Sequence, residues 1–75
     1  MMLFNAFLKL VDKEEWIRLG AFSAEDQYQG SEIAQRMIAL YLLDNEGAVD
    51  ERAELRGADS GKVFVSWNPV REEKH

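Results

Sequence analysis

The stretch SEIAQRMIALYLLDNEG, from Ser31 to Gly47, decides the fold, because the other predicted elements must pack around it. Ser31 can cap a helix with its hydroxyl group, and Gly47 can adopt the left-handed conformation that ends one, so we predict a helix through Leu43. At helical spacing one face of it is apolar and consists of Ile33, Ala34, Met37, Ile38, Leu40 and Tyr41. This helix raises the question of whether its outer face reads DNA or packs against protein.

The residues before Ser31 extend the helical pattern. Ser23, followed by Glu25 and Asp26, is typical of a helix start, because a hydroxyl cap and early acids suit the positive end of the helix dipole. Gly30 is unfavourable inside a helix. Two readings remain open: two helices separated at Gly30, or one long helix that contains it.

Two further elements precede this region. Residues 3–12 predict a helix, because Asn5, Lys9 and Asp12 fall on one stripe at helical spacing and apolar residues cover the rest. Such a broad apolar surface is either buried in the core or shared with a second chain, and we favour the core. Residues 16–22 alternate in the manner of a short strand.

The C-terminal part predicts a hairpin. Residues 61–67, GKVFVSW, form an unambiguous strand that ends before Pro69. Residues 49–56 fit a strand or a short helix, and we favour a strand because the strand at 61–67 needs a neighbour. The intervening GADSG has the composition of a hairpin loop. Residues 70–75 are predicted to be a frayed tail.

The predicted order is helix, strand, one or two helices, strand, strand, within a single α+β domain over residues 1–75. A small three-stranded antiparallel sheet would pack on the helices. If Gly30 breaks the central helix, this order resembles that of a winged-helix domain, in topology only. The alternative is one long helix across the same small sheet.

Composition limits the classes of function. A chain of 75 residues buries only about 60% of the surface that its unfolded form exposes, although a hydrophobic content of 47% is enough to fold. The sequence contains no cysteine, which excludes disulfides and thiolate zinc sites and suits a cytoplasmic protein. The apolar opening is shorter than the roughly 20 residues that span a bilayer, so we expect no membrane association.

Catalytic and metal-dependent functions find no support. His75 is the only histidine, which excludes a histidine-based triad and a multi-histidine metal site. The segment GADSGKV is one residue too short between its glycines for a phosphate-binding loop, and a strand is predicted where a helix is needed. We therefore predict a protein that is not an enzyme and has no catalytic residue, metal or cofactor.

The outer face of the central helix matches DNA poorly. A helix that enters the major groove presents Arg, Lys, Asn, Gln or Ser side chains. The outward positions here are Glu32, Gln35, Arg36, Ala39 and Leu43. A net charge of −5 also disfavours nucleic acid as a partner, because phosphate binding depends on Lys and Arg. The winged-helix alternative would take its phosphate contacts from Arg36, Arg52, Arg56 and Lys62.

Acidic residues gather after the central helix, beside a helix end that is apolar nearly all round. Acids around an apolar centre suit the capture of a basic protein surface, because charge speeds encounter and apolar contact supplies affinity. The predicted partner-binding residues are Leu43, Asp44, Glu46, Asp50, Glu51 and Glu54. An ordinary solvated turn is the alternative.

Three aromatic residues predict a second surface. If the apolar side chains of residues 17 and 19 face the helices, strand alternation leaves large aromatic side chains on the opposite side of the sheet. These residues are Trp16, Phe22 and Phe64. Such a patch would serve a homodimer or a partner contact, and a different register would remove it.

The sequence therefore predicts a small acidic protein-binding module, an inhibitor or regulator that occupies a basic surface of a partner protein, such as one that binds nucleic acid. Acidic inhibitors, immunity proteins and phage anti-defence proteins share this size and charge, and the likeness extends no further. The alternative is a winged-helix DNA-binding regulator of transcription.

Overall fold

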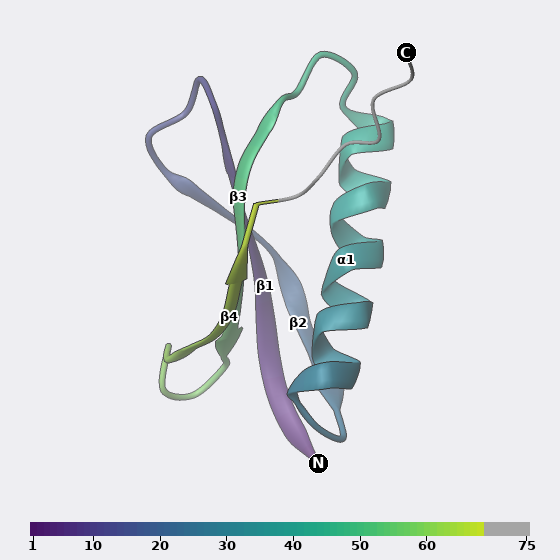
Figure 1. Ribbon diagram of the computed structural model, residues 1–75, viewed down its shortest axis with the longest axis vertical. Helices are drawn as coiled ribbons and strands as arrows, with labels where there is room; N and C mark the ends of the chain where they lie inside the picture. Colours follow the sequence, from purple (N-terminus) through teal and green to yellow (C-terminus); the bar gives the residue numbers. More distant parts are fainter. Residues whose placement is uncertain (69–75) are drawn as a thin grey trace.

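The computed structural model describes residues 1–68, which form a four-stranded sheet with one helix packed along one of its faces (Figure 1). The elements in chain order are β1 (Met2–Leu10), β2 (Trp16–Ala24), α1 (Gln27–Asp44), β3 (Asp50–Gly57) and β4 (Val63–Trp67). The strand order in the sheet is β2-β1-β3-β4, and every neighbouring pair is antiparallel. The predicted tail at residues 70–75 lies outside the described residues.

The prediction of a three-stranded sheet and an N-terminal helix is wrong, because residues 2–10 form β1, a central strand of the sheet. The misleading signal was the spacing of Asn5 and Lys9, since residues four apart share a face in a helix and in a strand alike. In the structure, Asn5, Phe7 and Lys9 lie on one side of β1, and the alternate residues are buried beneath α1. These buried residues are Phe4, Ala6, Leu8 and Leu10.

The winged-helix order is also wrong, because α1 runs without a break from Gln27 to Asp44 and Gly30 lies inside it. Gly30 is buried where the helix approaches the sheet most closely. A Cβ atom at this position would lie 3.1 Å from two ring carbons of Phe4 and 3.2 Å from Cδ2 of Leu55. The glycine therefore lets the helix pack against the sheet, and the low helix propensity of glycine is overridden by tertiary contact.

The core fills the space between α1 and the sheet. Its largest fully buried side chains are Phe4, Leu8 and Leu55. The Phe4 ring contacts the rings of Phe22 and Phe64 on either side, with centroid distances of 5.9 and 5.4 Å. Since Phe4 also lies under Gly30, one side chain connects three strands and the helix. Strand β3 occupies the region where we favoured a strand over a short helix.

Helix α1 begins at Asp26, whereas the sequence suggested Ser23 or Ser31 as the cap. The Asp26 carboxylate accepts a hydrogen bond of 2.9 Å from the backbone N–H of Gln29, which satisfies one of the amides left open at a helix start. The helix ends at Asn45, whose backbone and side-chain amides both donate to the Tyr41 carbonyl. The observed cap, Asp26, thus lies three residues C-terminal to Ser23, the first of the two predicted caps.

Asp26→Ala is expected to lower the free energy of unfolding by about 1 kcal/mol, because the Gln29 amide loses its acceptor. Urea denaturation followed by circular dichroism measures the change. Glu25→Ala is the matched control, since it removes a neighbouring exposed acid while the Glu25 backbone N–H still donates to Gln29 Oε1. Equal destabilisation by both substitutions would show that charge near the helix start matters and the cap does not.

Candidate functional site

Two loops meet at one end of the molecule. Residues 11–15 connect β1 to β2, and residues 45–49 connect α1 to β3 (Figure 1). The antiparallel pairing of β1 with β3 brings the loops together, because Leu10 pairs with Asp50 and the Val11 amide donates to the Val49 carbonyl at 2.8 Å. Residues that are more than thirty positions apart in the sequence therefore share one surface.

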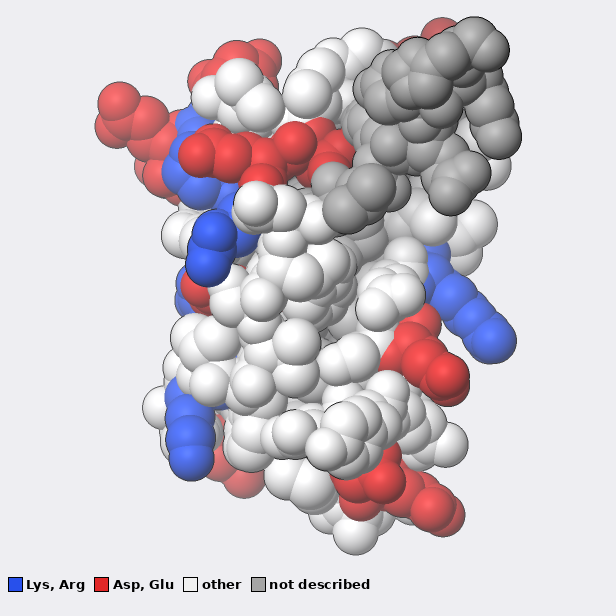
Figure 2. Space-filling model, viewed as in Figure 1, with Lys and Arg blue, Asp and Glu red and all other residues white. Residues whose placement is uncertain are grey.

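This surface is rich in carboxylates, and we call it the acidic end. Its acids are Asp12, Glu14 and Glu15 in the first loop, and Asp44, Glu46, Asp50 and Glu51 at or after the end of α1. Lys13 lies in the first loop, and Lys9 near the end of β1 forms an ion pair with Glu51 at 2.8 Å. In Figure 2, acidic side chains crowd the upper part of the molecule, where the two loops lie. The acidic end thus carries a large excess of negative charge.

Apolar side chains are exposed among these acids. The exposed fractions are 59% for Val11, 73% for Leu43 and 52% for Val49. The first loop also borders an open hollow of about 450 Å³, which is lined by residues 12–17 and by Tyr41 from the last turns of α1. The acidic end therefore combines charge, exposed apolar area and a concave element, as protein interfaces do.

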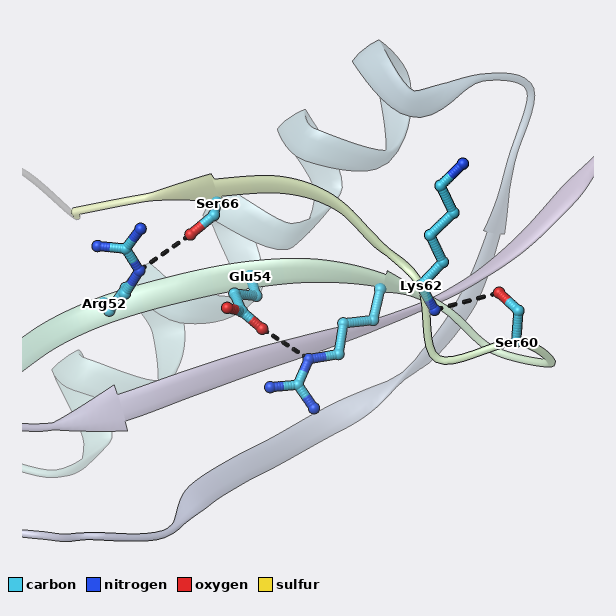
Figure 3. A network of polar contacts seen from close by, with 6 residues as sticks. Arg52, Glu54, Ser60, Lys62 and Ser66 are labelled. Atoms are coloured by element: carbon cyan, nitrogen blue, oxygen red, sulfur yellow. Dashed lines mark hydrogen bonds and ion pairs between the residues drawn. The ribbon is translucent and has the colours of Figure 1, made fainter.

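Five of the six predicted partner-binding residues lie in this region, and these are Leu43, Asp44, Glu46, Asp50 and Glu51. Glu54 does not belong to it. Glu54 lies further along β3, where its carboxylate accepts a 2.7 Å hydrogen bond from Arg56 Nε and its side chain is only 14% exposed (Figure 3). A carboxylate that is already paired and largely covered has little to offer a partner.

Sequence reasoning missed the contribution of the first loop. Asp12, Glu14 and Glu15 precede the predicted acidic stretch by about thirty residues, and the helix predicted over residues 3–12 gave no reason to bring them to it. The available signal was the alternation of Asn5 and Lys9 with apolar residues at 4, 6, 8 and 10, which fits a strand with a return at residues 11–15, but the apolar Phe7 between them fits a helix equally well. Only the pairing of that strand with β3 joins the two groups of acids.

The predicted aromatic patch is divided between the two faces of the sheet. Phe22 and Phe64 are half-buried on the helix side, where both pack against Phe4. Trp16 pairs with Lys9 and lies on the side away from α1, close to Arg56. The prediction of this patch also assumed regular alternation in the strand at 61–67 with Val63 facing the helices, which puts Phe64 on the opposite side. The structure has the reverse, because β4 carries an irregularity opposite Leu55 and Arg56.

The four basic residues of the winged-helix alternative do not share a surface. Arg36 is exposed on α1, whereas Arg52 and Arg56 extend from β3 on the opposite face of the sheet. Lys62 lies in the loop before β4, where its backbone N–H donates to Ser60 Oγ (Figure 3). A single DNA duplex in contact with α1 cannot reach Arg52 and Arg56 through the sheet.

Within residues 1–68, no group of three or more histidine, cysteine, aspartate or glutamate side chains is arranged to hold a metal ion. No helix in the same part of the chain has the length and apolar character needed to cross a membrane. No protein-family model, curated protein or solved structure matches this chain.

Proposed function

We propose that this protein is a small acidic binding module that acts in the cytoplasm, without catalysis, by covering a basic surface of another protein. One observation carries the proposal: the β1–β2 and α1–β3 loops converge, so that seven carboxylates and the exposed side chains of Val11, Leu43 and Val49 lie at the same end of the molecule. A basic surface that binds nucleic acid would be blocked in this way, because the carboxylates compete with phosphate for the same Lys and Arg side chains.

The two kinds of side chain contribute differently to such a contact. Attraction between opposite charges raises the association rate. This attraction weakens as salt is added, because the screening length is about 10 Å at 0.1 M ionic strength. Apolar side chains that leave water on binding supply affinity that salt does not remove. Leu43 is the most exposed of the three apolar residues, so we expect it to be the main apolar anchor.

The winged-helix function loses its structural basis with the fold. A winged-helix protein needs a separate recognition helix and a basic wing, whereas this chain has one unbroken helix over residues 27–44. The helix also packs along the sheet through the face that contains Gly30, Ala34 and Ile38. The exposed side of α1 keeps the mixture of one base, acids and apolar residues that already matched DNA poorly.

The test is to capture a partner protein from a whole-cell lysate with the purified protein immobilised on beads. A variant with Asp12→Lys, Glu14→Lys and Glu46→Lys reverses three exposed charges at the acidic end. The matched control is Glu25→Lys, Glu32→Lys and Asp59→Lys, which makes the same change in net charge at exposed positions elsewhere. We expect the wild-type protein and the control to retain the same basic protein at 150 mM salt, and the acidic-end variant to lose it at least tenfold.

Leu43→Ala provides a second readout, because the partner should then dissociate faster while the salt dependence stays the same. The stability of this variant should change by less than about 0.5 kcal/mol, since the side chain is exposed. The proposal fails if the two triple variants lose the partner equally, because net charge alone would then explain retention. It also fails if a retained protein is acidic.

A further inference from the structure

The face of the sheet away from α1 is not covered by any element of residues 1–68, and we call it the open face (Figure 1). Strand pairing places three rows of residues across it: Trp16, Lys9 and Arg52 in the first, Arg18, Phe7, Glu54 and Ser66 in the second, and Ala21, Asn5, Arg56 and Val63 in the third. In Figure 2 this face is seen in profile at the left edge, where most of the visible Lys and Arg side chains project.

The open face is basic although the protein is acidic. It carries Lys9, Arg18, Arg52 and Arg56, which are four of the seven Lys and Arg residues within the described part of the chain. Lys9 and Arg56 are paired with Glu51 and Glu54. The remaining two arginines bond to neutral acceptors. Arg18 donates to Asn5 Oδ1 at 3.2 Å, and Arg52 donates to Ser66 Oγ at 3.0 Å (Figure 3).

Two aromatic rings lie near these arginines, Phe7 on the strand between them and Trp16 on the same strand as Arg18. The guanidinium carbon of Arg56 is 4.0 Å from the centroid of the Phe7 ring and 5.0 Å from that of Trp16. Phe7 is on the central strand β1, next to Arg18 in the pairing with β2. Two rings and a planar guanidinium group thus form a cluster on this face, with the exposed Arg18 and Arg52 nearby.

We propose that the open face binds single-stranded nucleic acid. Unpaired bases stack on aromatic rings and on guanidinium planes, and arginine side chains contact the phosphates beside them. Arg18 and Arg52 are suited to the phosphates because their present partners are uncharged. Trp16 and the Arg56 guanidinium are suited to a base.

Other anionic occupants explain less of the surface. An acidic protein segment would use the arginines but has no need of two aromatic rings with a guanidinium over them. Duplex DNA presents its bases inside grooves that a helix or a two-stranded ribbon can enter, whereas this face belongs to a four-stranded sheet. A single strand is the ligand that offers both phosphates and exposed base faces.

The net charge of −5 is spread unevenly over the molecule, because most of the acids lie at the acidic end and around the start of α1. The open face carries four Lys and Arg residues against the paired Glu51 and Glu54. The overall negative charge repels phosphate and limits the affinity, so binding should be weak. This inference does not rest on the proposed function, because its phosphate contacts, Arg18 and Arg52, lie on the open face, although Trp16 also borders the hollow at the acidic end.

The test is fluorescence anisotropy with a labelled 15-nucleotide oligothymidylate, and with oligouridylate to separate DNA from RNA. We expect binding at 25 mM salt, with a slope of log K against log salt of about −1.4 to −2.8 for two to four phosphate contacts. Arg18→Ala and Arg52→Ala should each make the slope less steep by about 0.7. Arg36→Ala is the control, because it removes an exposed arginine on α1 and should change nothing.

Stacking has a separate signature. Trp16→Leu should lower the affinity for the oligonucleotide by about fivefold or more without changing the salt slope. Trp16→Phe should keep most of the wild-type affinity, because it retains an aromatic ring. Circular dichroism of each variant confirms that the fold is intact. The proposal is overturned if neither oligonucleotide binds at 25 mM salt, if a duplex of equal length binds as well, or if polyglutamate competes equally and Trp16→Leu has no effect. The last result would assign the face to an acidic protein.

Discussion

Phe4→Ala is expected to cause the largest loss of stability of any single substitution in the core. Phe4 is completely buried, and its ring contacts the rings of Phe22 and Phe64. The same ring fills the space that a Cβ atom at Gly30 would occupy. Removing a buried phenylalanine side chain destabilises a protein by about 3 to 5 kcal/mol. A chain of 75 residues has a total stability of roughly 4 to 11 kcal/mol, so this one change removes most or all of it at the lower end of that range.

Urea denaturation followed by circular dichroism and tryptophan fluorescence measures the loss. Leu3→Ala is the matched control, because Leu3 is the neighbouring residue on the same strand and is 55% exposed. We expect the control to change the free energy of unfolding by less than about 0.5 kcal/mol. If Phe4→Ala were as mild as Leu3→Ala, the aromatic cluster beneath α1 would not be the centre of the core.

Gly30→Val should be the second most destabilising change, and we expect it to lower the free energy of unfolding by about 3 kcal/mol. A Cβ atom here would already lie 3.1 Å from the Phe4 ring and 3.2 Å from Leu55, and valine adds two more carbon atoms to the same space. The helix must then move away from the sheet or the core side chains must leave their preferred rotamers, and overpacking of this kind destabilises by about 1 to 3 kcal/mol or more. This outcome opposes the propensity scale, on which glycine is the worse helix former.

Gln35→Val is the control for Gly30→Val, since it places the same β-branched side chain at an exposed position of α1. A double-mutant cycle with Phe4→Leu locates the strain, because leucine lacks the ring carbons that a Cβ at residue 30 would meet. We expect a favourable coupling of about 1 kcal/mol between Phe4→Leu and Gly30→Val. Simple additivity would place the strain elsewhere.

Different substitutions should affect binding at the two proposed surfaces. Reversing charges at the acidic end should release a basic protein partner and leave oligonucleotide binding at least as strong, because repulsion of phosphate decreases. Removing Arg18 or Arg52 should weaken oligonucleotide binding and leave capture of the basic partner unchanged. Each proposal can therefore fail while the other stands.

Several parts of the fold were readable from short segments. The second half of α1 and the strand near residues 61–67 followed from local periodicity and turn composition, and the strand at 50–57 was favoured because the strand at 61–67 needs a neighbour. The acids from Asp44 to Glu51 and the adjacent Leu43 could also be picked out as one stretch of the sequence, and the structure leaves Leu43 exposed. These features depend on residues close together in the chain, for which the pattern and the structure are set by the same few neighbours.

The sequence by itself determined that this protein is acidic, lacks cysteine and combines helix with antiparallel strands in an α+β arrangement. Only the tertiary structure decided the role of residues 2–10, because a segment that is apolar on nearly every side fits both periods until β2 and β3 pair with it. That pairing also moved Asp12 to the acidic end and gathered Arg18, Arg52 and Arg56 on one face. Charge clusters built across strands depend on register, and register is fixed by contacts between residues far apart in the chain.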